Sequence, residues 1–179
     1  VGLIGAGRTE LARLIMGADR PSSGEIWIDG KQMRPRSPSQ AIRAGIGMLP
    51  EDRKGQGLFI DHSVLDNTAV SSLQSHSRGG VLQKRQIRRS VQNLTDKMRL
   101  KTQSLRSRVS SLSGGNQQKV VFARWLMKDS DLHIMDEPTR GVDIGAKKEI
   151  YELIDHLAAS GKGILMISSE LPEALGVSD

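Results

Sequence analysis

Two adjacent carboxylates, Asp136 and Glu137, directly follow the apolar stretch 132–135. An apolar strand that ends in acids is typical of open α/β sheets, which bind ligands at the carboxyl ends of their strands. Asp136 is placed to hold Mg²⁺ through water, and Glu137 is placed to polarise an attacking water. The alternative is that the two acids are only a turn signal. His133, inside the same stretch, is interpreted as a structural residue rather than a ligand.

A glycine-rich segment, 2–9, offers a site for the phosphates that such chemistry needs. It follows a predicted strand and opens a predicted helix, which is the context of a phosphate-binding loop. Its N–H groups and the helix N-terminus would bind phosphate, and the Thr9 hydroxyl would bind Mg²⁺. Arg8 has a wide planar guanidinium and stands where such loops usually have the compact Lys. The alternative for the whole segment is a glycine-rich turn that is present for purely steric reasons. The residues predicted to contact phosphate are Gly2, Gly5, Ala6, Gly7, Arg8, Thr9 and Glu10.

A second predicted anion site lies at 112–119, where Ser113, Gly114 and Gly115 lead directly into a helix. The Ser113 hydroxyl and the two glycine amides would converge at the positive end of that helix, an arrangement suited to a γ-phosphate. The simpler interpretation is that Ser113 only caps the helix. We favour the anion site, because Gln117 and Gln118 follow in a helix that runs to 125.

Strand-like and helix-like stretches alternate along the chain and must position these segments. Strands are predicted at 1–4, 24–28, 46–49, 132–135 and 164–167, and helices at 9–16, 39–44, 63–73, 83–100, 116–127 and 144–159, with another starting at 171. Asp29-Gly30 predicts a hairpin turn, and Gly161 the C-cap of helix 144–159. The alternation predicts an α/β fold with a mainly parallel sheet. The segment 61–110 has no strand signal and is expected to be a helical insertion.

Composition favours a globular domain that works without thiol chemistry. Hydrophobic residues make up 37% of the 179 residues and cysteine is absent, which fits a reducing compartment. No apolar run approaches the roughly 20 residues of a membrane helix, and the start of the chain is expected to be part of a folded element rather than a signal peptide. Nine Lys or Arg residues and one acid, Asp96, lie between 84 and 108. They indicate either a surface for nucleic acid or anionic lipid, or a solvated helix face, and we favour the solvated face.

The three segments, in this order, resemble those of the ABC ATPases, a branch of the P-loop NTPases. Gly141-Val142-Asp143 matches that family's D-loop, and 50–54 stands where its Q-loop lies. The strings 5–10, 50–54 and 112–119 together look like the second cassette of the tandem importers for ribose, galactose, arabinose, xylose and related compounds. The resemblance implies a P-loop ATPase core at 1–60 and 111–179 with a helical subdomain at 61–110.

The same resemblance implies the ligands and partners. ATP and Mg²⁺ would bind, with Thr9 and Asp136 on the metal, Glu137 and Ser169 as catalytic residues, and Glu51 as the Q-loop sensor. In this family two cassettes pair head to tail, so the residues of 113–117 would contact the ATP held by the opposite cassette: Ser113, Gly114, Gly115, Asn116 and Gln117. The implied partners are a second cassette, membrane permease subunits and, indirectly, a periplasmic solute-binding protein, at the cytoplasmic face of the bacterial inner membrane. No nucleic acid is expected.

Three positions depart from the family pattern. Arg8 replaces Lys, Glu51 replaces the Q-loop Gln, and Ser169 stands where a switch His is expected. These replacements predict that the phosphate loop of this cassette forms a weakened site, while the segment 112–119, which resembles the family's signature motif, acts on the ATP of the partner cassette. We also expect the chain to be a fragment of a two-cassette protein. Two alternatives stay open: a soluble ABC protein that acts on ribosomes or nucleic acid, and a structural cassette that does not hydrolyse ATP.

Overall fold

The computed structural model describes residues 7–28 and 30–178, and a parallel sheet forms its centre. The strand order is β3 (Ile46–Leu49), β6 (Leu132–Asp136) and β7 (Gly163–Ile167). Leu49 lies opposite Met135, and Asp136 lies opposite Ile167. The three strands predicted at 46–49, 132–135 and 164–167 are therefore confirmed, whereas the predicted strand 1–4 lies outside the described residues.

Alternation along the strands produces two hydrophobic cores, one on each face of the sheet. Ile46, Ile134 and Ile167 face a core that contains Ala12 and Ala41. That face is covered by α1 (Arg8–Ile15) and α2 (Pro38–Arg43). Leu49 and Met135 face the opposite core, which is covered by α5 (Gly114–Lys128) and α6 (Ile144–Ala159). Helices on both faces of a parallel sheet confirm the predicted α/β class.

Short elements complete the core of the fold. The hairpin β1 (Ile26–Ile28) and β2 (Lys31–Met33) is antiparallel, with Ile28 opposite Lys31. Asp29 of the predicted turn lies outside the described residues. Ser160 is the C-cap of α6, and Gly161 is the left-handed residue that follows it, at φ 82°. The last helix, α7, covers Leu171–Val177.

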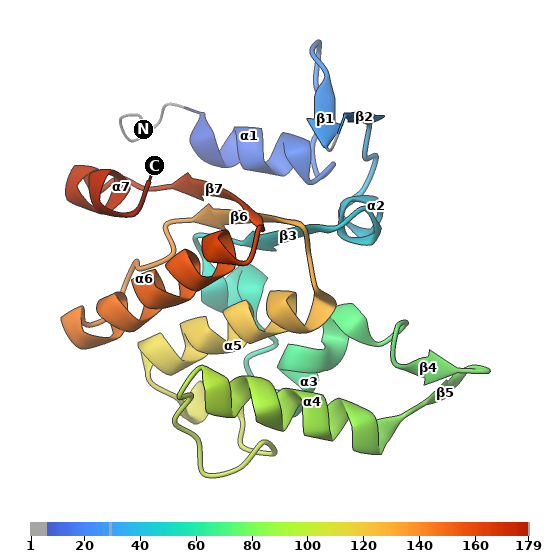
Figure 1. Cartoon of the computed structure of the whole chain (residues 1–179), viewed down its shortest axis with the longest axis vertical. Coiled ribbons are helices and arrows are strands. Elements are labelled where there is room, and N and C mark those ends of the chain that lie inside the picture. The colour runs from blue at the N-terminus through green and yellow to red at the C-terminus, as the bar shows by residue number, and fades with distance from the viewer. Residues whose placement is uncertain (1–6, 29, 179) are drawn as a thin grey trace.

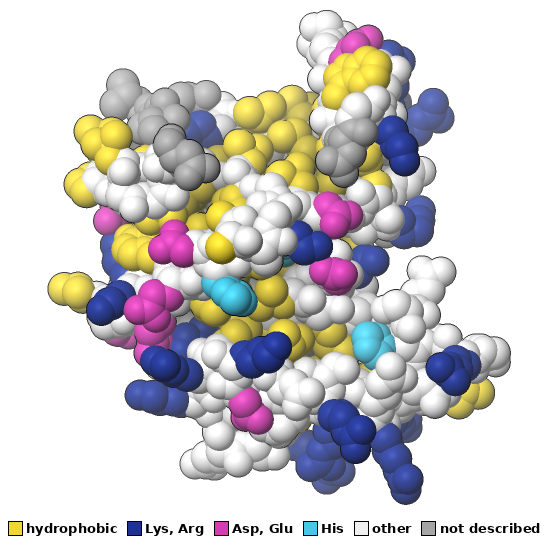
Figure 2. Space-filling view, viewed as in Figure 1, with side chains coloured by type: hydrophobic (Ala, Val, Ile, Leu, Met, Phe, Trp, Pro, Cys, Tyr) yellow, Lys and Arg dark blue, Asp and Glu magenta, His cyan; other side chains and the backbone are white. Residues whose placement is uncertain are grey.

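The segment 61–110 is mainly helical but not entirely so. It contains α3 (Val64–Ala69), the 3₁₀ turn η2 (Val70–Ser72), α4 (Lys84–Lys97) and the 3₁₀ turn η3 (Val109–Ser111). The expectation that it lacks strands is wrong, because β4 (Ser77–Arg78) and β5 (Val81–Leu82) form a small hairpin. Gly79 and Gly80, at φ 55° and 80°, supply the left-handed conformations that a two-residue turn needs. Figure 2 shows Lys and Arg side chains gathered along the lower edge of the molecule, over α4 and this hairpin.

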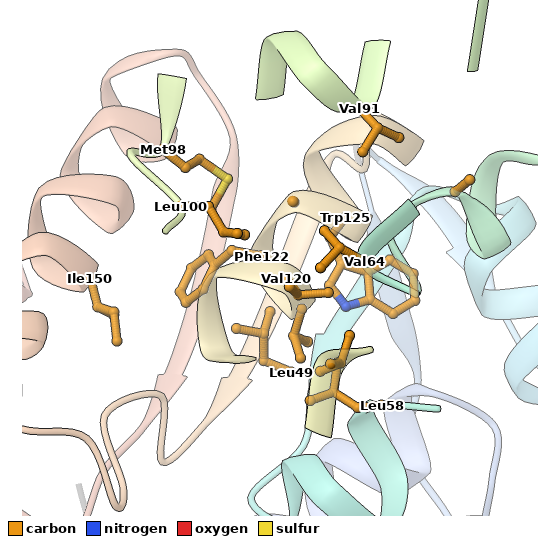
Figure 3. Packing of buried hydrophobic residues seen from close by; sticks show 14 of the residues in the cluster. Leu49, Leu58, Val64, Val91, Met98, Leu100, Val120, Phe122, Trp125 and Ile150 are labelled. Atoms are coloured by element: carbon orange, nitrogen blue, oxygen red, sulfur yellow. The ribbon is translucent and has the colours of Figure 1, made fainter. Parts of the chain in front are cut away.

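Helix α5 connects the sheet to the helical segment. Its Val120, Phe122 and Trp125 lie in one cluster with Val64 of α3 and Val91 of α4, as Figure 3 shows. Leu49 of β3 and Ile150 of α6 belong to the same cluster. Because one core spans both parts, the division into 1–60 plus 111–179 and 61–110 stays a prediction. No described helix has the length and apolarity needed to cross a bilayer.

Candidate functional site

A cavity of about 690 Å³ opens at the carboxyl ends of β6 and β7. The sheet supplies Asp136 and Ile167, and α1 supplies the other side through its first turn. Its described lining residues are Gly7, Arg8, Thr9, Glu10, Glu51, Asp136, Glu137, Thr139, Arg140, Gly141, Val142, Lys147, Ile167, Ser169 and Glu170. Segments from five parts of the sequence thus meet where the two adjacent acids were expected to act.

Thr9 and Asp136 form the oxygen-rich floor of the cavity. The Thr9 hydroxyl donates a hydrogen bond to Asp136 Oδ2 at 2.7 Å, and Asp136 is only 1% exposed. Hydroxyl and carboxylate oxygens are ligands that Mg²⁺ accepts, and Mg²⁺ typically takes one or two protein ligands and completes its shell with phosphate oxygens and water. The described residues hold no cluster of three His, Cys, Asp or Glu side chains that could cage a metal alone. The donor set therefore fits a magnesium ion that arrives with a phosphate ligand.

Glu137 is held in an unusual backbone conformation beside Ser169. Its φ is 50°, in the left-handed region, and its N–H donates to the Ile167 carbonyl at 2.9 Å. The Ser169 hydroxyl donates to Glu137 Oε2 at 3.1 Å. The two predicted catalytic residues thus lie in direct contact. A strained non-glycine residue at the mouth of a cavity is a feature that clusters at functional sites.

Arg8 reaches across the cavity to the last strand. Gly7, at φ 74°, precedes α1, and the Arg8 guanidinium donates to the Ser168 carbonyl. Thr9 and Glu10 line the cavity from the same turn. The phosphate-loop residues Gly2, Gly5 and Ala6 lie outside the described residues.

The cavity carries more acids than bases. Five carboxylates line it, those of Glu10, Glu51, Asp136, Glu137 and Glu170, against three cations. Two of the cations are already paired: Lys147 bonds Glu170 at 2.7 Å, which raises the pKa of Lys147, and Arg140 contacts Glu51. Side-chain charge alone therefore does not attract a triphosphate, so a metal ion and backbone N–H groups are needed.

The second predicted anion site lies apart from this cavity. Ser113 caps α5, because its hydroxyl oxygen accepts from the Asn116 backbone N–H at 3.5 Å and from Asn116 Nδ2 at 2.9 Å. The simple capping interpretation therefore describes the geometry, and the anion role stays a prediction. Gln117 is 4% exposed and donates to the carbonyls of Val109 and Leu112. Its side chain serves the fold, which the sequence did not indicate.

The two glycines of this segment are closely packed. A Cβ on Gly114 would lie 2.8 Å from Arg53 Nη2 and 2.9 Å from the Gly141 carbonyl oxygen. A Cβ on Gly115 would lie 2.6 Å from Cβ of Ala146. All three distances are shorter than atoms in contact tolerate, so each position favours glycine for reasons within this chain alone.

Three charged residues that line the cavity were not predicted from the sequence: Arg140, Lys147 and Glu170. No role was predicted for Arg53 either, which bonds the carbonyls of Arg140 and Gly141 beside the cavity. Arg140 lies three residues after Glu137, and this closeness to the two acids is the one local signal of its role. His133 is buried inside β6 and does not line the cavity, and burial lowers its pKa. Its placement agrees with a structural role.

The family model for ABC transporters matches residues 1–140, and the chain belongs to this family. Among solved structures, a nucleotide-free ATP-binding cassette of an ABC transporter superposes with a TM-score of 0.81 at 20% identity, over 98% of this chain and 71% of that one. A dimeric cassette bound to ADP and phosphate superposes with a TM-score of 0.76 at 22% identity, over 92% and 71%. These likenesses show that the fold is that of a P-loop ATPase of the ABC type.

Relatives of higher identity are import ATP-binding proteins. A ribose import ATP-binding protein of Rubrobacter xylanophilus is 51% identical over 179 residues, which are 99% of this chain and 36% of the relative. A putative ribose/galactose/methyl galactoside import ATP-binding protein of Rhizobium meliloti is 52% identical over 178 residues, with 99% and 36% coverage. The chain thus spans about a third of the length of these relatives.

Proposed function

We propose that the chain is one ATP-binding cassette of a sugar-type ABC importer, the second of two in its parent protein. The observation that carries the proposal is the meeting of Thr9, Asp136, Glu137 and Ser169 in one cavity, at the first turn of a helix. The sugar class rests on the printed names of relatives at 51% and 52% identity. As an importer ATPase, the protein would work at the cytoplasmic face of the bacterial inner membrane.

The side chains at the cavity suggest a division of roles in hydrolysis. Thr9 and Asp136 would hold Mg²⁺, which would neutralise charge on the phosphates when bound. Glu137 would accept the hydrogen bond of the attacking water and polarise it. Ser169 would keep the Glu137 carboxylate in place through the bond at 3.1 Å. Serine cannot take up a proton as a histidine can, so this cassette's own site would be the weaker of the two.

A groove of about 810 Å³ beside the cavity suits a membrane subunit. Apolar side chains from both sides of the fold line it, among them Met16, Ile42, Phe59, Leu73 and Trp125. The segment 50–59 connects the two sites, because Glu51 lines the cavity while Pro50, Gln56 and Phe59 line the groove. We therefore propose that a cytoplasmic loop of the permease binds here, so that its movement reaches the nucleotide through this segment.

The experiment that tests the function measures ATP hydrolysis and sugar uptake by the complete transporter. We expect uptake of labelled ribose or galactose to require the gene, and Glu137→Gln to lower ATP turnover by this cassette at least tenfold. Glu152→Gln is the matched control. It makes the same change from carboxylate to carboxamide, at an exposed residue of α6 outside the cavity. If the protein instead fractionates with ribosomes or nucleic acid and its loss leaves sugar uptake intact, the soluble ABC alternative is favoured.

A further inference from the structure

Two arginines, one from each segment, join the segment 50–54 to the turn 139–141. Arg53 Nη1 donates to the Arg140 carbonyl at 2.7 Å, and Arg53 Nη2 donates to the Gly141 carbonyl at 3.2 Å. In the opposite direction, the Arg140 guanidinium pairs with the Glu51 carboxylate. Each arginine thus contacts the segment that carries the other one.

The ion pair contributes little to the stability of the fold. The side chains of Arg140 and Glu51 are 63% and 38% exposed, and exposed pairs of this kind are weak because water and salt screen them. Its position suggests another role, because both residues line the cavity that contains Asp136 and Glu137.

The charge of the cavity indicates what that role is. A bound Mg·ATP keeps a net negative charge, and an unpaired Glu51 would repel it in a site that already has four other carboxylates. Arg140 cancels this charge. Arg140 also lies close to the proposed catalytic carboxylate, since its backbone N–H donates to the Glu137 carbonyl at 3.1 Å.

Arg53 secures the backbone that carries Arg140. Its guanidinium is partly buried, which lowers the pKa of Arg53, and its fork spans two consecutive carbonyls. The absence of a side chain on Gly114 makes room for it, since a Cβ there would lie 2.8 Å from Arg53 Nη2. Lys, with a single charged nitrogen, cannot reproduce such a two-point contact.

We propose that Arg140 and Arg53 are positioning residues of the nucleotide site: Arg140 holds and neutralises Glu51, and Arg53 holds the turn that carries Arg140. The acid at position 51 and the arginine at position 140 then form a compensating pair. This inference rests on the proposed binding of Mg·ATP in the cavity.

A double-mutant cycle on the complete ATP-binding protein tests the pair. Calorimetry would measure Mg·ATP binding to the wild type, Arg140→Ala, Glu51→Gln and the double variant. We expect Arg140→Ala to weaken binding at one site on the order of tenfold, because Glu51 is left unpaired. The double variant should return to within about threefold of wild type, because the neutral Gln needs no partner. Lys162→Ala, which removes a cation from the surface pairs with Asp129 and Asp131, should change nothing.

The outcomes separate this inference from the proposed function. If the wild type binds no Mg·ATP, both are overturned. If it binds Mg·ATP but the double variant remains as weak as Arg140→Ala, or Arg140→Ala binds like wild type, only the compensating pair is overturned. For Arg53, we expect Arg53→Lys to lower kcat of ATP hydrolysis several-fold while KM changes little, with thermal unfolding close to wild type. If Arg53→Lys instead lowers the unfolding temperature clearly and kcat falls along with it, Arg53 is only a structural residue.

Discussion

Among single residues, the site combines side chains that face the cavity with side chains that only hold other parts of the fold. Thr9, Asp136 and Glu137 face the cavity, whereas Gln117 and Ser113 are used by the fold itself. Glycine at 114 has one observed role within the chain and one proposed role toward the opposite cassette. It would leave room for the γ-phosphate of the opposite cassette, and it leaves room for Arg53 in its own.

A comparison of Gly114 with Arg8 tests the proposed asymmetry of the two nucleotide sites. Gly114→Asp should abolish ATP hydrolysis in the complete two-cassette protein, because the side chain blocks the signature and collides with Arg53 and Gly141. Arg8→Ala should leave a substantial part of the hydrolysis rate, because in the proposed model Arg8 belongs to the nucleotide site that Glu51 and Ser169 weaken. Steady-state rates in the assembled transporter decide this. If Arg8→Ala is as inactive as Gly114→Asp, the asymmetric model is wrong; circular dichroism should first show that Gly114→Asp is folded.

His133 predicts a pH dependence of stability. Burial lowers its pKa from the ordinary value of 6.5, and its Nδ1 has no hydrogen-bond partner among the residues that the structure describes. Below pH 6.5 the unfolded chain therefore binds a proton that the folded chain resists, so the free energy of unfolding should fall as the pH is lowered. Urea unfolding from pH 7.5 to 5.5 measures this slope. His133→Gln should make the slope smaller, and an identical slope in the variant would exclude His133 as its source.

Among the elements, α5 packs against the sheet on one side and against α3 and α4 of the helical segment on the other. Besides its apolar contacts, it places the buried Arg124 against α3, with Nε donating to the Asn67 carbonyl at 2.8 Å and Nη2 to Asn67 Oδ1 at 3.1 Å. Asn67 in turn exchanges hydrogen bonds with the backbone of Phe59. The start of α3, the segment at 59 and α5 thus form one polar network inside the apolar core.

Replacing Arg124 should therefore loosen the helical segment. Burial lowers the pKa of Arg124 to about 10, so the guanidinium remains charged at neutral pH and keeps its bonds. Arg124→Met keeps much of the volume but removes both donors to Asn67, so that Asn67 Oδ1 keeps only the bond from the Phe59 N–H. This loss should cost about 2–4 kcal/mol of unfolding free energy. Chemical denaturation measures the loss, with Lys128→Met as the comparison on the same helix, because Lys128 is only partly buried and Arg124 is buried. A loss below about 1 kcal/mol would show that water replaces the missing bonds.

In the whole molecule, the segment 50–59 lines both the cavity, through Glu51, and the groove, through Pro50, Gln56 and Phe59. This arrangement suits a protein that transmits movement between a nucleotide and a partner. The cations of α4 and its hairpin lie at another edge, and no described ion pair uses them. A solvated face remains the favoured interpretation of that surface.

A crosslink from Ser71 tests the groove. Ser71 lines it between Val70 and Leu73, so Ser71→Cys in the assembled transporter should crosslink to a cytoplasmic loop of the permease. A cysteine at Glu152, on the exposed side of α6, should give far less product. Crosslinks from Ser71→Cys to RNA or ribosomal protein alone would contradict the permease assignment.

The α/β class, the three sheet strands and part of the cavity lining, including Thr9, Asp136 and Glu137, were predictable from the sequence alone. The strands were predictable because they are fully buried and read as short apolar runs, and the acids because they follow one of these runs. The hairpin within 61–110 was not predictable from the sequence, because strands of two residues carry almost no periodicity. Only the tertiary structure decided that Glu51 pairs with Arg140 and that Arg53 bonds the turn after it. These partners lie more than 85 residues apart, and local patterns contain no information about which distant side chains the packed core brings together.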